Sequence, residues 1–319
     1  MDYELNEDQR AILEAVGSLL ERHAGPARAI SLAVEGAYDV ELDTALQAAG
    51  FDGLVQGPET GALEAALVVD AIASAPGVVA YAAGGLVLPA VLRDCGAAGS
   101  AESLRTGPLA LLQAGEAGPV RFGAHAHRAL VLDADEARLV SLDPAESTPV
   151  RSNFGYPLGI PGKTLGAGER LPAGAGRSLR NWWRVALAIE AVGTMSGALF
   201  QTTEYLKQRR QFGRAIASFQ AVQHRLAECA IVLEGSRWLA LEAAYHGAPE
   251  DLAATAAAYA LAAAGRVFSE THQLSGAIGF THEHDLHVWT MRLQALRVEL
   301  GGVSGHCRAV SGTRWGISP

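Results

Sequence analysis

The chain has 319 residues, with 25 Lys and Arg against 34 Asp and Glu, so its formal net charge is −9. An acidic chain without a basic block lacks the clustered cations that bind nucleic-acid phosphates, which excludes a nucleic-acid-binding protein. Hydrophobic residues make up 49% of the chain and charged residues 18%, a composition that excludes a disordered protein.

The sequence also bears on the compartment. Its N-terminal segment is acidic and has no apolar run, which predicts no secretory signal peptide. The apolar stretch 252–264 is shorter than the roughly 20 residues that a membrane span needs. The three cysteines, Cys95, Cys229 and Cys307, lie far apart and favour a reducing compartment over a disulfide framework or a zinc site. We expect a soluble cytoplasmic protein that binds no membrane.

Residues 1–105 have a helical pattern. Asn6 suits a helix N-cap. After it, apolar residues recur at three- and four-residue steps, as one face of an amphipathic helix requires: Ile12, Leu13, Val16, Leu19 and Leu20. Further helical runs are predicted at 40–49 and 60–73, and residues 77–92 predict a buried helix pair or turn.

Residues 106–172 change to short β-type runs separated by Gly, Asp and Ala turns. The runs are 108–112, 120–122, 128–132 and 138–142. So small a sheet domain is marginally stable alone, and we expect it to pack on the helices.

Residues 173–319 return to long helical runs, at 178–208, 219–245, 249–274 and 285–300. Short breaks between four long helices predict an antiparallel four-helix bundle. The predicted fold class is therefore mainly α with a small β domain. It consists of an N-terminal helical domain (1–105), a reduced middle β domain (106–172) and a C-terminal four-helix bundle (173–319).

The segment 208–220, QRRQFGRAIASFQ, lies at a predicted helix end and leads through a tight turn into the next helix. Guanidinium groups, amides and an aromatic ring at one corner of a bundle suit a dinucleotide. Cations at Arg209 and Arg210 also cap a helix C-terminus favourably without any ligand. The chemistry of the residues leaves both interpretations open.

This segment resembles the R-x-x-F-G…Q motif of the acyl-CoA dehydrogenase family. A second family motif, Q-x-x-G-G-x-G-F, is matched by QLSGAIGF at 273–280, with Ala277 in place of one Gly. The continuation THEHDLH at 281–287 resembles the F-T-W-E-H-D-x-H form of actinobacterial members. The order helical, β, helical agrees with the family along nearly the whole chain.

The resemblance implies an enzyme that uses FAD to introduce an α,β double bond into an acyl-CoA thioester and passes electrons to an electron-transfer flavoprotein. In the family the two C-terminal motifs hold the adenine and pyrophosphate end of an FAD whose flavin ring belongs mainly to a neighbouring subunit. Carried over, this assigns cofactor binding to Arg209, Gln211, Phe212, Gln220, Gln273 and Gly276.

The sequence departs from the family at the catalytic base. One family position for this Glu falls near Gly301, and the other falls on or beside Trp183. Neither residue can accept the proton, so no catalytic residue is assigned. Glu190, on the same helix face as Trp183, and Glu299, two residues before Gly301, are the carboxylates that could substitute.

The family's T-E-P and G-S-D segments, which bind the flavin ring and approach the acyl-CoA, have no counterpart between residues 107 and 170. This combination resembles the smaller, degenerate subunit of the heterotetrameric acyl-CoA dehydrogenases of actinobacterial steroid catabolism. A homologous full-length partner subunit is then implied, which supplies the base and the flavin-ring site for a steroid side-chain CoA. The alternatives are a self-sufficient homo-oligomer that uses Glu190 or Glu299, and a non-catalytic scaffold.

Two other features of the sequence are interpreted as structural. His282, His284 and His287, with Glu283 and Asp285, span a loop-to-helix junction, and a polar interface accounts for them better than a metal. Trp182 and Trp183 on an apolar helix suit either the core or a subunit interface, and in a bundle that assembles we favour the interface.

Overall fold

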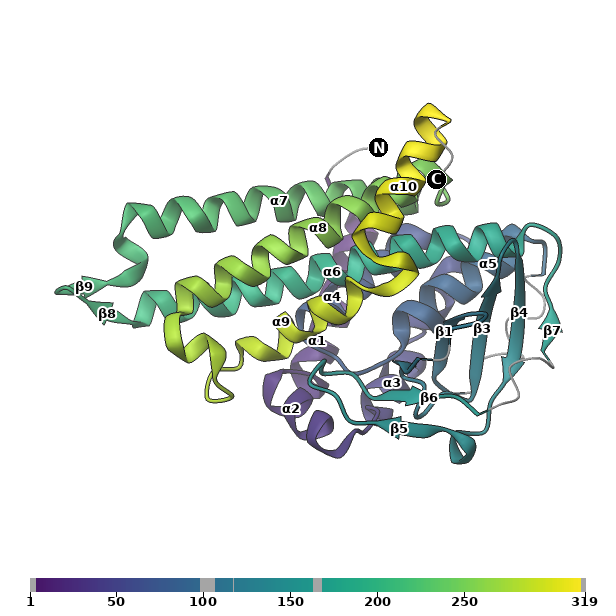
Figure 1. The fold of residues 1–319 in the computed structure, drawn as a ribbon, viewed down its shortest axis with the longest axis horizontal. Coiled ribbons are helices and arrows are strands. Elements are labelled where there is room, and N and C mark those ends of the chain that lie inside the picture. Colours follow the sequence, from purple (N-terminus) through teal and green to yellow (C-terminus); the bar gives the residue numbers. More distant parts are fainter. Residues whose placement is uncertain (1–3, 98–106, 117, 163–167, 317–319) are drawn as a thin grey trace.

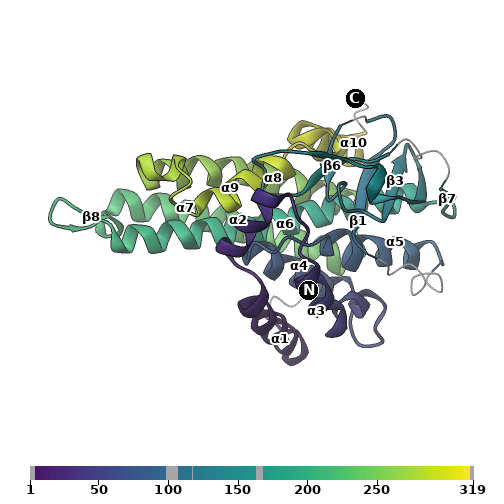
Figure 2. The ribbon, with the colours of Figure 1, turned by 90° about the horizontal axis from the view of Figure 1, so that it is seen from below.

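The computed structural model describes residues 4–97, 107–116, 118–162 and 168–316. A long helical bundle carries the small β region at one end, and the N-terminal helices pack along its side (Figures 1 and 2). The predicted limit between residues 105 and 106 lies outside the described residues.

The N-terminal part is helical, as predicted. It comprises α1 (Glu7–His23), α2 (Pro26–Glu35), α3 (Val40–Ala48), α4 (Ala62–Ser74) and α5 (Leu88–Asp94), with a π-helical turn at Ala82–Val87. Asn6 is the N-cap of α1, since its side chain accepts a hydrogen bond of 2.8 Å from the Gln9 backbone N–H. The sequence analysis missed α2, although Pro26 after Gly25 suits a first helical turn.

Two small sheets follow. β1 (Leu109–Gln113), β3 (Arg128–Asp133), β4 (Glu136–Ser141) and β7 (Glu169–Arg170) pair in that order, with β1 parallel to β3. β2 (Val120–Arg121), β6 (Leu158–Ile160) and β5 (Thr148–Val150) form the second sheet. All four predicted runs contain strands, whereas β5, β6 and β7 were missed because two or three residues carry no detectable alternation.

The C-terminal part contains α6 (Ala175–Gln208), α7 (Gln220–Tyr245), α8 (Glu250–Ser275), α9 (Leu286–Leu296) and α10 (Gly302–Trp315). A hairpin of β8 (Arg210–Gln211) and β9 (Arg214–Ala215) projects from the far end of the bundle (Figure 1). The fourth predicted helix, 285–300, is wrong at its end, because Leu300, Gly301 and Gly302 have positive φ values of 51°, 80° and 63°. They break the helix, and the chain continues as α10, which was not predicted.

Helix α6 is the centre of the core, and every residue from 181 to 195 is buried. Its glycines let neighbours approach closely: a Cβ at Gly193 would collide with the Asp70 backbone of α4. Trp182 and Trp183 are buried inside the chain, so the predicted subunit interface at this pair is wrong. Their indole N–H groups donate to Asp94 and Glu299, each at 2.7 Å.

Helix α9, in the C-terminal part, forms hydrogen bonds with the N-terminal part of the chain. The Trp289 indole N–H donates to the Ser74 carbonyl, and the Arg292 guanidinium donates to the Gly77 carbonyl, each at 2.9 Å. Arg292 is fully buried, and the Tyr156 ring lies 5.0 Å from its guanidinium carbon. The N-terminal helices are therefore held against the C-terminal bundle.

Two helical segments, Ala175–Gln208 and Glu250–Phe280, have the length and apolar composition of a membrane span. In the first, 83% of the most apolar window is buried inside the protein, and in the second 50% is. The apolar side chains of α6 are thus accounted for by the core.

Candidate functional site

The two sequence motifs meet in one open groove at the hairpin end of the bundle. Arg209 and Gln211 follow the end of α6, and Ser275 and Gly276 end α8; all four line this groove, which has a volume of about 570 Å³. We call it the motif groove. It brings together segments that are more than sixty residues apart in the sequence.

The hairpin side of the motif groove is held by local structure. Phe212 and Gly213 have positive φ values of 54° and 80°, which suits the tight turn between two paired strands. The Arg214 guanidinium lies 3.9 Å from the centre of the Phe219 ring, and the Phe212 ring meets Phe219 edge to face. These contacts orient the hairpin and leave Phe212 89% exposed.

The α8 side of the motif groove presents backbone and a free hydroxyl. Gly276 has a φ of +68° and open space where a Cβ would lie, so its backbone is accessible to a ligand. The Ser275 Oγ is buried and has no hydrogen-bond partner among the described residues. A buried hydroxyl without a partner is a site for an external donor or acceptor.

The sequence-predicted residues are distributed unevenly around the motif groove. Arg209, Gln211 and Gly276 line it. Phe212 is at the hairpin tip, Gln220 is the first residue of α7, and Gln273 is exposed in the last turn of α8, all outside the lining. The sequence analysis missed Ser275, which lies between two motif residues that it had identified.

The histidine-rich segment beside the motif groove is held by ordinary contacts. His284 is buried against the Tyr205 ring at 5.0 Å, and burial lowers its pKa. The His287 Nδ1–H donates a 3.0 Å hydrogen bond to the His284 carbonyl. Within the described part of the chain, no group of three or more His, Cys, Asp or Glu side chains could hold a metal ion.

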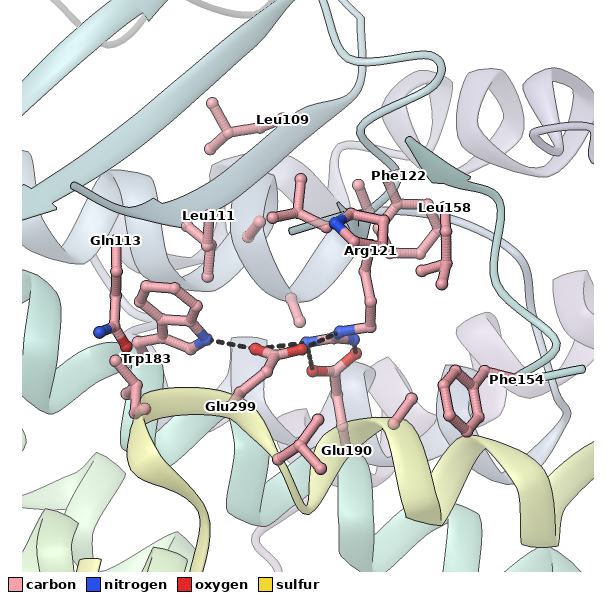
Figure 3. A pocket seen from close by; sticks show the side chains of 18 of the residues that line it. Leu109, Leu111, Gln113, Arg121, Phe122, Phe154, Leu158, Trp183, Glu190 and Glu299 are labelled. Atoms are coloured by element: carbon pink, nitrogen blue, oxygen red, sulfur yellow. Dashed lines mark hydrogen bonds and ion pairs between the residues drawn. The ribbon is translucent and has the colours of Figure 1, made fainter. Parts of the chain in front are cut away.

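A second candidate site is a cavity of about 300 Å³ between the β region and the bundle. Apolar side chains dominate its lining, as Figure 3 shows for Leu109, Leu111, Phe122, Phe154 and Leu158. We call it the central cavity. Trp183, Glu190 and Glu299 also line it, so one cavity contains the side chain at one family position for the base and both substitute carboxylates.

Arg121 of β2 crosses the central cavity and pairs with both carboxylates (Figure 3). Its guanidinium donates to the two Glu190 oxygens at 2.7 and 2.9 Å and to Glu299 Oε1 at 2.5 Å. The Trp183 indole N–H donates to the other Glu299 oxygen at 2.7 Å. Burial by itself lowers the pKa of Arg121, but the charges of Glu190 and Glu299 raise it well above its usual value.

This network decides what Glu190 and Glu299 can do. A guanidinium binds both oxygens of Glu190, and Glu299 is bound by Arg121 and Trp183. All four carboxylate oxygens of Glu190 and Glu299 therefore already accept hydrogen bonds from these two side chains. The sequence analysis missed Arg121, although a lone arginine within the apolar run 120–122 signals a buried ion pair.

The central cavity borders α10 through Leu300. Leu300 follows Glu299 directly and adopts a left-handed conformation, with φ 51° and ψ 39°. A leucine in this region costs about 1–3 kcal/mol, so the surrounding contacts must hold it there. The bonds from Arg121 and Trp183 to Glu299 fix the preceding residue.

His306 of α10 provides a pH-dependent contribution to stability. It is fully buried, and burial, reinforced by the positive charge of Arg184 and opposed by the nearby backbone carbonyl of Glu299, lowers its pKa to about 4. An unfolded histidine titrates near 6.5. Between these pH values the unfolded state binds a proton that the folded state does not, so stability is lost as the pH falls.

As the pH falls from 6.5 to 4, the free energy of unfolding should decrease in both the wild type and His306→Gln. We expect the decrease to be larger in the wild type by up to about 3 kcal/mol. Urea unfolding of both proteins across this range measures the difference, in which the other titrating groups cancel. Equal slopes for the two proteins would contradict the buried, neutral His306.

The sequence of the chain is similar to those of known proteins. Residues 177–311 match the family described as "Acyl-CoA dehydrogenase, C-terminal domain". The acyl-CoA dehydrogenase IpdE2 of Mycolicibacterium smegmatis is 28% identical over 316 residues, covering 93% of this chain and 96% of that protein. IpdE2 of Mycobacterium tuberculosis is 39% identical over 108 residues, and that alignment covers only 34% of either protein.

Solved structures of known proteins share the fold of this chain along nearly its whole length. The ChsE4-ChsE5 complex of Mycobacterium tuberculosis contains a chain of the same fold, with a TM-score of 0.82, 22% identity and 100% of both chains covered. A variant of the Tcur3481-Tcur3483 steroid ACAD gives a TM-score of 0.79 at 24% identity, over 96% of this chain and 97% of that one. The chain therefore has the acyl-CoA dehydrogenase fold.

Proposed function

We propose that the chain belongs to the acyl-CoA dehydrogenase family and is the smaller subunit of a heteromeric, FAD-dependent acyl-CoA dehydrogenase. In this proposal its motif groove completes an FAD site that is shared with a homologous full-length partner. The partner supplies the catalytic base and binds the flavin ring. The double bond is introduced into an acyl-CoA thioester, with a steroid side-chain CoA as the substrate.

The observation that carries the proposal is the Arg121 network. A base for α-proton abstraction needs a carboxylate that is free to take a proton. Both carboxylates of the central cavity are instead bound by a buried guanidinium, and the family positions for the base fall on or beside Trp183 and near Gly301. With both carboxylates of the central cavity engaged in this way, the proposal assigns the base to another subunit.

The residues of the motif groove fit one half of FAD. Arg209 can pair with a phosphate, because a guanidinium binds phosphate oxygens in a bidentate manner. The accessible backbone at Gly276 and the unpartnered Ser275 Oγ suit close contact with the dinucleotide, and Gln211 offers an amide. FAD, when bound, supplies the acceptor for the β hydride, and this chain binds and orients its adenine and pyrophosphate end.

Exposed apolar side chains around the motif groove support a subunit interface there. Phe212 is 89% exposed and Phe280 is 74% exposed. Large exposed apolar side chains that gather near a site are typical of surfaces that a partner covers. Similarity to the ChsE4-ChsE5 complex and to a steroid ACAD supports a steroid-type substrate and an unlike partner.

Two alternative functions can be distinguished from the proposed one. A self-sufficient homo-oligomer would need Glu190 or Glu299 as its base, and the bonds from Arg121 oppose this role for both. A scaffold without redox chemistry would have no use for a groove that unites two dinucleotide motifs. Electrons would leave the complex through an electron-transfer flavoprotein, as in the family.

The flavin-to-chain ratio tests the proposal. The visible spectrum is measured for the protein purified alone and for its complex with the homologous full-length chain. We expect no flavin on the protein alone and fewer flavins than chains in the complex, since unlike chains share each site. A flavin on every chain of the protein alone would support the self-sufficient enzyme, and a complex without flavin would support the scaffold.

A further inference from the structure

A basic cleft opens beside the central cavity, at the end of α6 remote from the motif groove. Arg180 and Arg184 of α6 and Arg308 of α10 line it, and its volume is about 750 Å³. Arg184 and Arg209 are separated by about 38 Å along α6 at 1.5 Å per residue. The basic cleft is therefore distinct from the groove assigned to FAD.

Arg184 is a buried and poorly satisfied charge in the basic cleft. Its side chain is only 9% exposed, and its partners are distant: Asn181 Oδ1 at 3.5 Å and Glu250 Oε1 at 3.9 Å. Its Nε has no hydrogen-bond partner among the described residues, and burial lowers its pKa. A buried guanidinium with so few bonds gains from an anion that binds it directly.

The basic cleft and the central cavity share part of their lining. Gln113, Glu116 and Leu300 border both, so the basic cleft adjoins the apolar interior, with one carboxylate at the junction. The Gln113 Oε1 is buried and has no partner among the residues that the structure describes. Rotating this amide by half a turn presents its NH₂ group, so Gln113 can donate to an anion or accept from a hydroxyl.

The charges that line the basic cleft limit the kind of anion that it can bind. Arg180 is already paired with Asp135, and Glu116 and Glu250 also line the basic cleft. The surplus of positive charge is therefore small, which favours one negative charge over a doubly charged phosphate. The central cavity, at about 300 Å³, is at the lower end of the range for small-molecule sites and is lined mainly by apolar side chains.

We propose that the basic cleft and the central cavity together bind a hydrophobic carboxylic acid. Its carboxylate pairs with Arg184 and Arg308, and its apolar chain passes Leu300 and lies between Leu111 and Leu158. The Arg121 network leaves no free base in this cavity, so the ligand is bound without reaction. This site does not depend on the FAD site of the proposed function.

Isothermal titration of the full chain with octanoate, and with octan-1-ol as the matched neutral probe, tests this. We expect octanoate to bind more tightly than octan-1-ol. Arg184→Met should weaken octanoate binding roughly ten- to a hundred-fold, the effect of losing a charge-assisted hydrogen bond, and leave octan-1-ol binding unchanged. Arg308→Ala, at an exposed position, should weaken octanoate binding in the same direction and covers the case in which Arg184→Met fails to fold.

Arg177→Met is the matched control, because Arg177 is exposed on the same helix and lies outside the cleft lining. Leu111→Trp should fill the cavity and abolish binding of both probes. Equal affinity for octanoate and octan-1-ol, the absence of octanoate binding, or unchanged octanoate binding in Arg308→Ala would each overturn the proposal. The flavin-to-chain ratio is measured separately, so a failure here is distinguishable from a failure of the proposed function.

Discussion

Arg121→Met should lower the free energy of unfolding by about 3–5 kcal/mol, the cost of removing one partner from a buried ion pair. The substitution leaves Glu190 and Glu299 facing each other in the apolar cavity with no cation between them. Their mutual repulsion and the loss of solvation both act on the folded state. Urea unfolding followed by circular dichroism, for the wild type and the variant at neutral pH, measures the difference.

Removing the charges of Glu190 and Glu299 as well should restore the stability that is lost in Arg121→Met. Adding Glu190→Gln and Glu299→Gln to Arg121→Met removes every charge of the Arg121 network, and most of the stability should return. Arg10→Met, at an exposed position on α1, is the matched control and should change stability by no more than about 0.5 kcal/mol. If Arg121→Met were as harmless as Arg10→Met, the two carboxylates would not depend on Arg121, and the self-sufficient enzyme would regain support.

Arg209→Ala should weaken FAD binding by the complex roughly ten- to a hundred-fold, as expected for losing a guanidinium–phosphate contact. The cause is local, since Arg209 lines the motif groove and is exposed at the end of α6. The flavin absorbance that remains after dialysis of the complex, followed by titration with FAD, measures the change. Stability should change by less than about 0.5 kcal/mol, because an exposed side chain is removed.

Arg210→Ala is the matched control for this experiment. Arg210 is the neighbouring residue, has the same charge and is also exposed, but it lies outside the lining of the motif groove. FAD binding should therefore be affected little. Equal loss of FAD in both variants would mean that the general positive charge of the hairpin matters, and retention of FAD in both would contradict the assigned role of Arg209.

The regular parts of the fold could be predicted from the sequence. Helices α3, α6, α7 and α8 follow from apolar periodicity and from glycine or proline at their ends, and their observed bounds differ little from the expected ones. Both C-terminal motifs were found because each is contiguous in sequence. Their meeting in one groove depends on α6 and α8 ending at the same end of the bundle, which the antiparallel arrangement implies.

The network in the central cavity could not be predicted in the same way. Arg121 meets Glu299 across 178 residues and Glu190 across 69, and no local pattern encodes such a pairing. Glu190 and Glu299 were identified from their spacing to the family positions for the base, but their cation was not. Helix α10 was missed because it buries only His306, so its sequence lacks the apolar stripe that marks a helix on a core.

The contacts of α9 with the N-terminal helices govern the order in which the chain folds during synthesis. Trp289 and Arg292 each bond to a carbonyl 215 residues earlier, so these bonds form only after most of the chain has left the ribosome. Until α6 emerges, α4 can pack only on the N-terminal helices and turns and lacks its main packing partner. The first helices made are therefore completed last, and nascent chains expose apolar surface to chaperones for most of translation.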